Sequence, residues 1–241
     1  MIFGNDSLAA ELALDDLLTL CPGTGAAIAH DRHGEAVDLT EACAVLRRWD
    51  RRMDLDSRGA ALFAEFFMPL TRQPGGFPAA TVPFDPADPL HTPRGLDLSA
   101  EHAEGLRTGL AEAVRALASR GVALDAPWGS VQHAVRGEEK IPVHGGSGML
   151  GVLNMQESPW REGVGYVPVH GSSYMQIVTF DPDGPVADAV LSYSQSTDPA
   201  SPHYADQTKL YSAKRWNRLP FTPAQVRAEQ VSVEHLRGTT H

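Results

Sequence analysis

Cysteine is scarce in this chain, which has Cys21 and Cys43 among its 241 residues. Two cysteines cannot form the network of disulfide bonds that holds a small secreted domain together, and their spacing matches no zinc-binding pattern. We expect two buried thiols, with a disulfide bond between them as the alternative. The scarcity of cysteine excludes a disulfide scaffold and a cysteine-based metal site.

Basic residues and long apolar runs are also scarce. The chain has 20 Lys and Arg residues against 30 Asp and Glu residues, a formal net charge of −10, which argues against a nucleic-acid partner. One local basic cluster alternates with aspartates and predicts a solvated helix face or internal ion pairs: Arg47, Arg48, Arg51 and Arg52 with Asp50, Asp54 and Asp56. No apolar run approaches the ~20 residues that span a bilayer, so we expect no membrane span.

The pattern of the remaining residues predicts an α+β protein in which helices come first and antiparallel strands follow. Residues 1–72 form a predicted helical segment, with helices beginning at Ser7, Thr40 and Ser57. In the first helix, the leucines at positions 8, 12, 17 and 18 form the expected apolar stripe. Six prolines in residues 73–98 predict an irregular surface connection. Residues 99–241 begin with a long helix from Ser99 to Arg120 and continue as a β-rich segment.

Within that segment, short runs predict strands at Val131–Arg136, Ile141–Val143 and Leu150–Asn154. Two further runs, Ser173–Phe180 and Val186–Tyr193, flank the turn residues Asp-Pro-Asp-Gly-Pro and predict a β-hairpin. The polar residues from Ser192 to Thr208 then predict a loop held by side-chain to backbone hydrogen bonds. A last helix begins at Thr222, with Pro223 and Gln225 in the capping positions.

Several residues resemble catalytic or metal-binding groups, but a simpler interpretation is favoured for each. His30, His33, His144 and His170 lack a third or fourth ligand nearby in the sequence, so we expect turn or hydrogen-bonding histidines. The His144–Gly148 loop resembles a serine nucleophile elbow, but Met149 replaces its last glycine, which disfavours a hydrolase built from Ser147 and His203.

Other sites have equally simple explanations. The hydroxyl groups of Ser172, Ser173 and Ser196 are expected at turns and strand ends. Asp54, Asp56 and Ser57 lack the glycine and glutamate of a calcium loop, and Asp56 and Ser57 are expected to begin a helix. Glycine-rich phosphate-binding motifs are absent. The residues therefore predict no catalytic, cofactor-binding or metal-binding side chain in this chain.

Longer stretches carry a family resemblance. The run YSQSTDPASPHYADQTKLYSAKRWNRLPFT, from Tyr193 to Thr222, resembles the carboxyl-terminal end of the penicillin acylase family, in particular its acyl-homoserine lactone and lipopeptide acylases. Three earlier stretches agree in the same order: Ala9–Cys21, Leu46–Phe66 and Trp128–Asn154. The resemblance covers nearly the whole chain.

This resemblance implies the carboxyl-terminal part of the large subunit of an N-terminal nucleophile hydrolase with an αββα core. Such enzymes cleave the amide bond of N-acyl compounds such as acyl-homoserine lactones, cyclic lipopeptides or β-lactams. The implied nucleophile is the amino-terminal serine of that subunit, which has no counterpart here. Asn5 matches the lead-in to the first helix rather than the oxyanion asparagine. Any structural calcium of the full-length family would also have its ligands upstream.

The resemblance further implies partners and a location. The partners are the missing amino-terminal portion or small subunit, and a small N-acyl substrate for the complete enzyme. The alternative is a non-catalytic binding or structural module that pairs with another acylase subunit. Met1 leads into the first helix without a basic region or cleavage site, so we expect no signal peptide. This fits a cytoplasmic protein or a chain whose upstream part is missing; the family's members are usually periplasmic or secreted.

Overall fold

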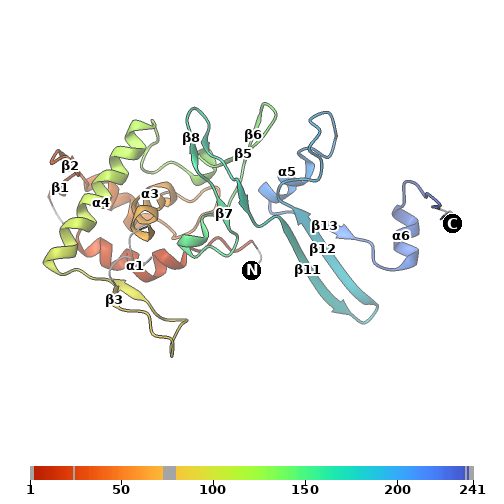
Figure 1. Ribbon diagram of the computed structural model, residues 1–241, viewed down its shortest axis with the longest axis horizontal. Coiled ribbons are helices and arrows are strands. Elements are labelled where there is room, and N and C mark those ends of the chain that lie inside the picture. Colours follow the sequence, from red (N-terminus) through yellow and green to blue (C-terminus); the bar gives the residue numbers. More distant parts are fainter. Residues whose placement is uncertain (1–2, 24, 73–79, 237, 239–241) are drawn as a thin grey trace. The chain divides into compact units, whose positions relative to one another are not determined.

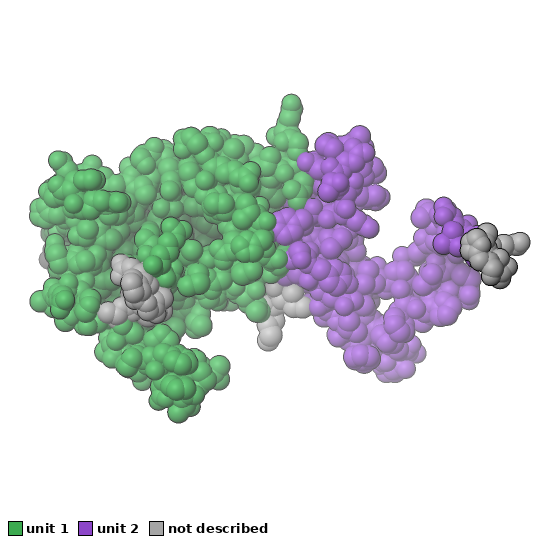
Figure 2. Space-filling view, in the orientation of Figure 1, with its two compact units in different colours: residues 1–172 green, residues 173–241 purple. Residues whose placement is uncertain are grey.

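The structure is a computed structural model that describes residues 3–23, 25–72, 80–236 and 238. It divides into two compact units, residues 1–172 and 173–241 (Figure 2). Helices and small antiparallel sheets occur together, which confirms the predicted α+β class. The sequence-based division into residues 1–72, 73–98 and 99–241 stays a prediction. The two compact units follow from contacts between residues, which do not test that division.

Four helices build the core of the first unit: α1 (Leu8–Thr19), α2 (Thr40–Arg48), α3 (Ala60–Thr71) and α4 (Ala100–Ser119) (Figure 1). Helix α3 is buried on almost every side, and the rings of Phe63 and Phe67 stack at 5.4 Å between centroids. Helix α4 lies against α3, where Gly109 leaves room for the ring of Phe66. The apolar side chains of α3 therefore form the centre around which the unit packs.

The predicted helix starts are right in part. The hydroxyl of Ser7 accepts the N–H of Ala10 and caps α1, as expected. Leu39 rather than Thr40 is the capping residue of α2. Helix α3 begins after Gly59, whose φ of 110° is unfavourable for other residues. Ser57 lies before it and donates its hydroxyl hydrogen to Asp50, so the prediction that Ser57 begins this helix is wrong.

The predicted apolar stripe of α1 is also wrong in part. Leu17 is buried, but Leu8 is 50% exposed. The buried face instead carries small residues next to two leucines: Ala9, Ala10, Ala13, Leu14 and Leu17. With about 3.6 residues per turn, position 8 lies on the opposite side of α1 from Leu17, so Leu8 does not belong to the buried face.

Two small hairpins accompany these helices. Strands β1 (Ile28–His30) and β2 (Ala36–Asp38) pair between α1 and α2 in the sequence. Strands β3 (Ala80–Val82) and β4 (Arg94–Leu96) pair within the proline-rich connection. The expectation of an irregular connection is therefore wrong for residues 80–82 and 94–96, which form the two strands, and right for residues 83–93, which contain the described prolines. Residues 73–79 lie outside the described part of the chain.

The rest of the first unit consists of short elements. They are the 3-10 turns η1 (Trp128–Ser130) and η2 (Gly148–Leu150), and the strands β5 (His133–Arg136), β6 (Glu139–Pro142), β7 (Gln156–Glu157), β8 (Trp160–Arg161), β9 (Gly165–Tyr166) and β10 (His170–Gly171). The strands pair as β5 with β6, β7 with β10 and β8 with β9, all antiparallel. The predicted strand at Leu150–Asn154 is wrong, because η2 and a turn at Gly151 occupy this stretch.

The second unit contains the predicted β-hairpin. Strands β11 (Tyr174–Asp181) and β12 (Gly184–Leu191) pair one to one, and β13 (Asn217–Leu219) lies on the other side of β12 (Figure 1). Helix α6 (Pro223–Glu229) has the predicted capping box of Thr222 and Gln225. The end of the predicted loop is instead helix α5 (Asp206–Ser212). Its residues Thr208 and Tyr211 are buried, and this packing stabilises the helix.

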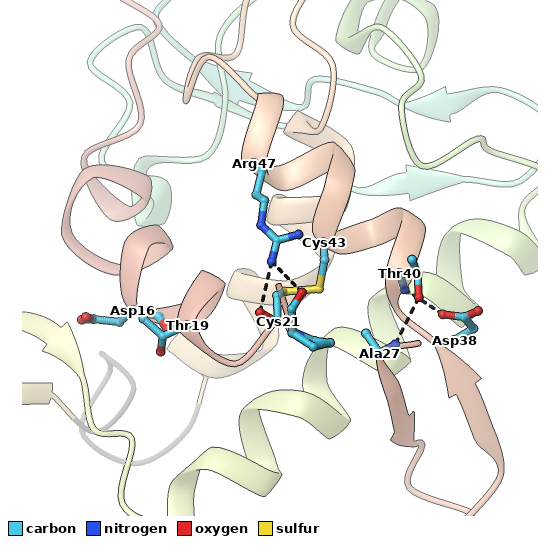
Figure 3. The surroundings of a disulfide bond; sticks show 9 residues. Asp16, Thr19, Cys21, Ala27, Asp38, Thr40, Cys43 and Arg47 are labelled. Atoms are coloured by element: carbon cyan, nitrogen blue, oxygen red, sulfur yellow. Dashed lines mark hydrogen bonds between the residues drawn. A yellow bond between two sulfur atoms is a disulfide. The ribbon is translucent and has the colours of Figure 1, made fainter. Parts of the chain in front are cut away.

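Cys21 and Cys43 form a disulfide bond, so the expectation of two buried thiols is wrong (Figure 3). The bond joins the end of α1 to the middle of α2. The guanidinium of Arg47 donates to the carbonyl groups of Cys21 and Pro22 at 3.1 and 3.2 Å. Spacing alone could not predict this bond, because the turn of β1 and β2 brings the two helices together.

Among the described residues, no helix combines the length and the apolar character required to cross a membrane.

Candidate functional site

A cluster of four buried polar side chains lies in the first unit. The amide of Asn5 donates to Asp54 Oδ1 at 2.5 Å, and Asn5 Oδ1 accepts from the amide of Asn154 at 2.9 Å. The same amide of Asn154 lies 2.9 Å from His144 Nδ1. Asn5, His144 and Asn154 are at most 1% exposed. The cluster therefore joins three parts of the chain that are far apart in the sequence, around residues 5, 54 and 144–154.

Main-chain bonds run alongside this cluster. Met53 N donates to Asn5 O at 2.8 Å, Asn154 N donates to Gly4 O at 3.1 Å, and Gly145 N donates to Met53 O at 2.9 Å. Gly145 has no room for a side chain, since a Cβ would lie 2.4 Å from Asn154 O. The polar side chains of the cluster thus form hydrogen bonds with one another. Their role is structural, because they hold the neighbouring main-chain segments in place.

The loop that resembles a nucleophile elbow lies beside this cluster. Ser147 donates its hydroxyl hydrogen to Glu157 Oε1 at 2.8 Å and accepts the N–H of Met149 at 3.1 Å. The group that accepts the hydroxyl hydrogen of Ser147 is therefore a carboxylate, whereas the nucleophilic serine of a catalytic triad donates to an imidazole. His203 belongs to the second unit, where its Nδ1 lies 2.8 Å from Asp206 Oδ2.

The other sequence candidates lie apart from one another. His30 and His170 lie on the exposed strands β1 and β10, and His33 lies in the turn after β1. Asp54 contacts Asn5 and Arg52. In the part of the chain that the structure describes, no three His, Cys, Asp or Glu side chains gather in a way that could hold a metal ion.

A cavity of about 350 Å³ opens in the first unit beside Ser147. Its apolar lining includes Met53, Met68, Leu150 and Trp160, and its polar lining includes Gln132, Glu157 and Arg72. Gln132 donates to the carbonyl groups of Val143 and Gly145, which fixes its orientation. The cavity is large enough for a small molecule or a few side chains.

A charged group lines the same cavity. Arg120 Nη1 lies 2.6 Å from Glu65 Oε1, and the hydroxyl of Tyr166 donates to the same oxygen at 2.5 Å. Burial and the charge of Glu65 raise the pKa of Tyr166. Burial lowers the pKa of Arg120, but the hydrogen bond to Glu65 and its charge outweigh this effect and raise it. Both groups therefore keep their protons at neutral pH and cannot act as bases.

Sequence reasoning did not identify this group. One signal was present: Glu65 is the single charged residue in the apolar run from Ala60 to Leu70. Such a residue requires a partner when its helix is buried. The identity of that partner could not be inferred, because Arg120 and Tyr166 lie on other elements.

Comparisons with known proteins give consistent results. The family model for penicillin amidase matches residues 1–228. The chain is 42% identical over 234 residues to aculeacin-A acylase of Actinoplanes utahensis, a match that covers 95% of this chain and 28% of that protein. It is 38% identical over 244 residues to the acyl-homoserine lactone acylase PvdQ of Pseudomonas savastanoi pv. phaseolicola, covering 99% of this chain and 30% of that protein. The chain thus spans less than a third of the length of these relatives.

Proposed function

Because this chain belongs to the penicillin amidase family, we propose that it is the carboxyl-terminal portion of a hydrolase that cleaves the amide bond of N-acyl compounds. The observation that carries this proposal is the match of nearly the whole chain to two acylases at 42% and 38% identity. By their names, one relative acts on aculeacin A and the other on acyl-homoserine lactones. The proposed substrate class is therefore an N-acylated lactone or lipopeptide.

In this proposal the chain supplies part of an αββα core and another part of the polypeptide supplies the reactive groups. The nucleophile is a serine at the amino terminus of a processed subunit, with its own α-amino group as the base. An amine with a pKa near ~8 can accept a proton at neutral pH. Two observations support this division. The match covers only 28% of aculeacin-A acylase, and the hydroxyl of Ser147 contacts a carboxylate in place of an imidazole.

A chimera tests the proposal. This chain replaces the aligned region of aculeacin-A acylase, and release of fatty acid from aculeacin A is measured. We expect turnover by the chimera, inhibition by a serine-directed reagent, and no turnover by this chain alone. A folded chimera without activity would refute the proposal. Serine-dependent turnover by the chain alone would also refute it, and would make Ser147 and Ser172 the candidates.

A second candidate function is a non-catalytic module that pairs with another acylase subunit. The observation that favours it is the continuous core of the first unit, where Phe63, Leu62 and Phe67 are fully buried. A monomer that melts cooperatively and binds an acylase without changing its turnover would support the module over the hydrolase portion.

A further inference from the structure

Strand β11 has the features of a strand that another strand must cover. It is an edge of the three-stranded sheet of the second unit, with β12 as its neighbour among the described strands. All eight of its residues pair with β12 in continuous register, from Tyr174 with Leu191 to Asp181 with Gly184. Strand β11 is as long as β12, with eight residues each, and its continuous register shows no bulge.

The direction of its backbone groups follows from this register. The pair Asp181 and Gly184 closes a two-residue turn, so its N–H and C=O groups bond across the hairpin. Pairs alternate along an antiparallel ladder, so Met175, Ile177 and Thr179 also bond to β12. The N–H and C=O groups of the alternate residues point away from β12: Tyr174, Gln176, Val178 and Phe180.

The side chains of these same residues are exposed and mostly apolar. Tyr174 is 55% exposed, Val178 is 44% exposed and Phe180 is 81% exposed. Soluble proteins protect edge strands with charged residues, prolines or bulges. Residues 174–180 contain no charged residue and no proline. Within the described residues, no strand pairs with the outer edge of β11, which presents backbone groups and an apolar surface without the usual protection.

We infer that the outer edge of β11 pairs with a β-strand from the part of the longer acylase polypeptide that this chain does not contain. This inference rests on the proposed function. The occupant has alternating apolar side chains, which pack on Tyr174, Val178 and Phe180 while its backbone completes the ladder. The relatives are more than three times as long as the matched region, so ample chain exists to supply the strand. A strand in the same polypeptide also has a higher effective concentration than a second copy.

Hydrogen exchange at single residues tests the inference in the chimera and in the isolated chain. In the isolated chain we expect rapid exchange at Gln176, Val178 and Phe180, and protection at Ile177 and Thr179. In the chimera we expect exchange at the first three amides to slow at least 100-fold. Rapid exchange at these amides in a folded chimera would overturn the inference. So would protection in the isolated chain, whether a second copy at high concentration or another part of the same chain provides it.

A pair of variants tests the same edge by its backbone. Val178→Pro removes an outward N–H that the hairpin does not use, and edge strands tolerate proline at such positions. Val178→Thr keeps the N–H and serves as the matched control. We expect Val178→Pro to lower the yield of folded chimera at least 10-fold, and Val178→Thr to lower it less than twofold. Equal yields, or failure of the unaltered chimera to fold where aculeacin-A acylase folds, would contradict the inference.

The two proposals fail in different measurements. A folded chimera that shows slowed exchange at β11 but no amide hydrolysis contradicts the proposed function and leaves the strand pairing in place. A folded, active chimera in which the outer amides still exchange rapidly contradicts the pairing alone.

Discussion

Removal of the disulfide bond between Cys21 and Cys43 should destabilise the first unit by about 3 kcal/mol. The bond closes a loop with a sequence separation of 22 residues. Chain-entropy arguments assign about 3 kcal/mol to a loop of this size, because the cross-link restricts the unfolded chain. Both cysteines are buried, so the alanine variant also loses packing, and the figure for Cys21→Ala with Cys43→Ala is a lower bound.

Urea denaturation measures this effect. Tryptophan fluorescence reports mainly on the first unit, which contains Trp49, Trp128 and Trp160. With a slope of about 2–3 kcal/mol per molar urea, a loss of about 3 kcal/mol lowers the midpoint by about 1–1.5 M. The same decrease should follow addition of dithiothreitol to the unaltered protein. The double alanine variant is the internal control, because dithiothreitol should not change its midpoint.

Two results would refute this reasoning. An unaltered protein whose urea midpoint does not change on reduction would show that the bond does not restrict the unfolded chain as calculated. Reaction of two thiols with a chromogenic disulfide in the native, unreduced protein would show that the bond does not form.

Three further predictions concern polar groups in the first unit. Asn5→Ala removes the buried hydrogen bonds that Asn5 makes with Asp54 and Asn154 and should lower the free energy of unfolding by about 1–3 kcal/mol in urea. Glu112→Gln should cost less than about 1 kcal/mol at pH 6 because the ion pair with Arg32 is partly exposed. The hydrogen bond from Arg32 lowers the pKa of Glu112 from 4.5 to about 2, so this difference, measured in urea, should persist above pH 4.5 and vanish as the pH falls through about 2. Glu65→Ala and Arg120→Met should together destabilise less than the sum of the single changes, with a coupling of about 1–2 kcal/mol in a double-mutant cycle.

Each of these has a result that would contradict it. Glu138→Ala, in an exposed turn, is the control for Asn5→Ala and should change stability by less than about 0.5 kcal/mol; equal effects would mean that the buried cluster adds nothing. A constant difference between Glu112→Gln and the unaltered protein from pH 6 to pH 2 would contradict the lowered pKa. Strict additivity of the Glu65 and Arg120 changes would show that the two charges act independently.

Local signals predicted those elements that local interactions define. Ser7 caps α1, Thr222 and Gln225 form the capping box of α6, and the turn before Gly184 closes the hairpin of β11 and β12. In each case the residues that decide the structure lie within a few positions of one another. The hairpin and these two helix starts follow from such short-range bonds, so local sequence patterns were sufficient to predict them.

Features that depend on distant residues could not be predicted in this way. Leu8 is as apolar as a core residue, but which side of α1 faces the core depends on distant elements, and Leu8 lies on the outer side and is 50% exposed. The cluster of Asn5, His144 and Asn154 joins positions up to 149 residues apart. Glu65 signalled a buried charge, but its partners are Arg120, directly after α4, and Tyr166 on β9, which only the tertiary packing brings together.

The buried cluster also bears on how the proposed enzyme divides its tasks. Residues 4–7 are held on one side by Arg51 and Met53 and on the other by Asn154, through bonds of 2.8–3.1 Å. The ring of Phe3, just before this segment, lies edge-on to the ring of His144 at 5.4 Å between centroids. An amine-activated serine must have a free α-amino group, whereas the nitrogen of Ser7 is a main-chain amide that donates to Arg51 O at 2.9 Å. The same bonds that fix the path of residues 4–7 thus favour a role for this region in scaffolding, and leave the nucleophile to another part of the polypeptide.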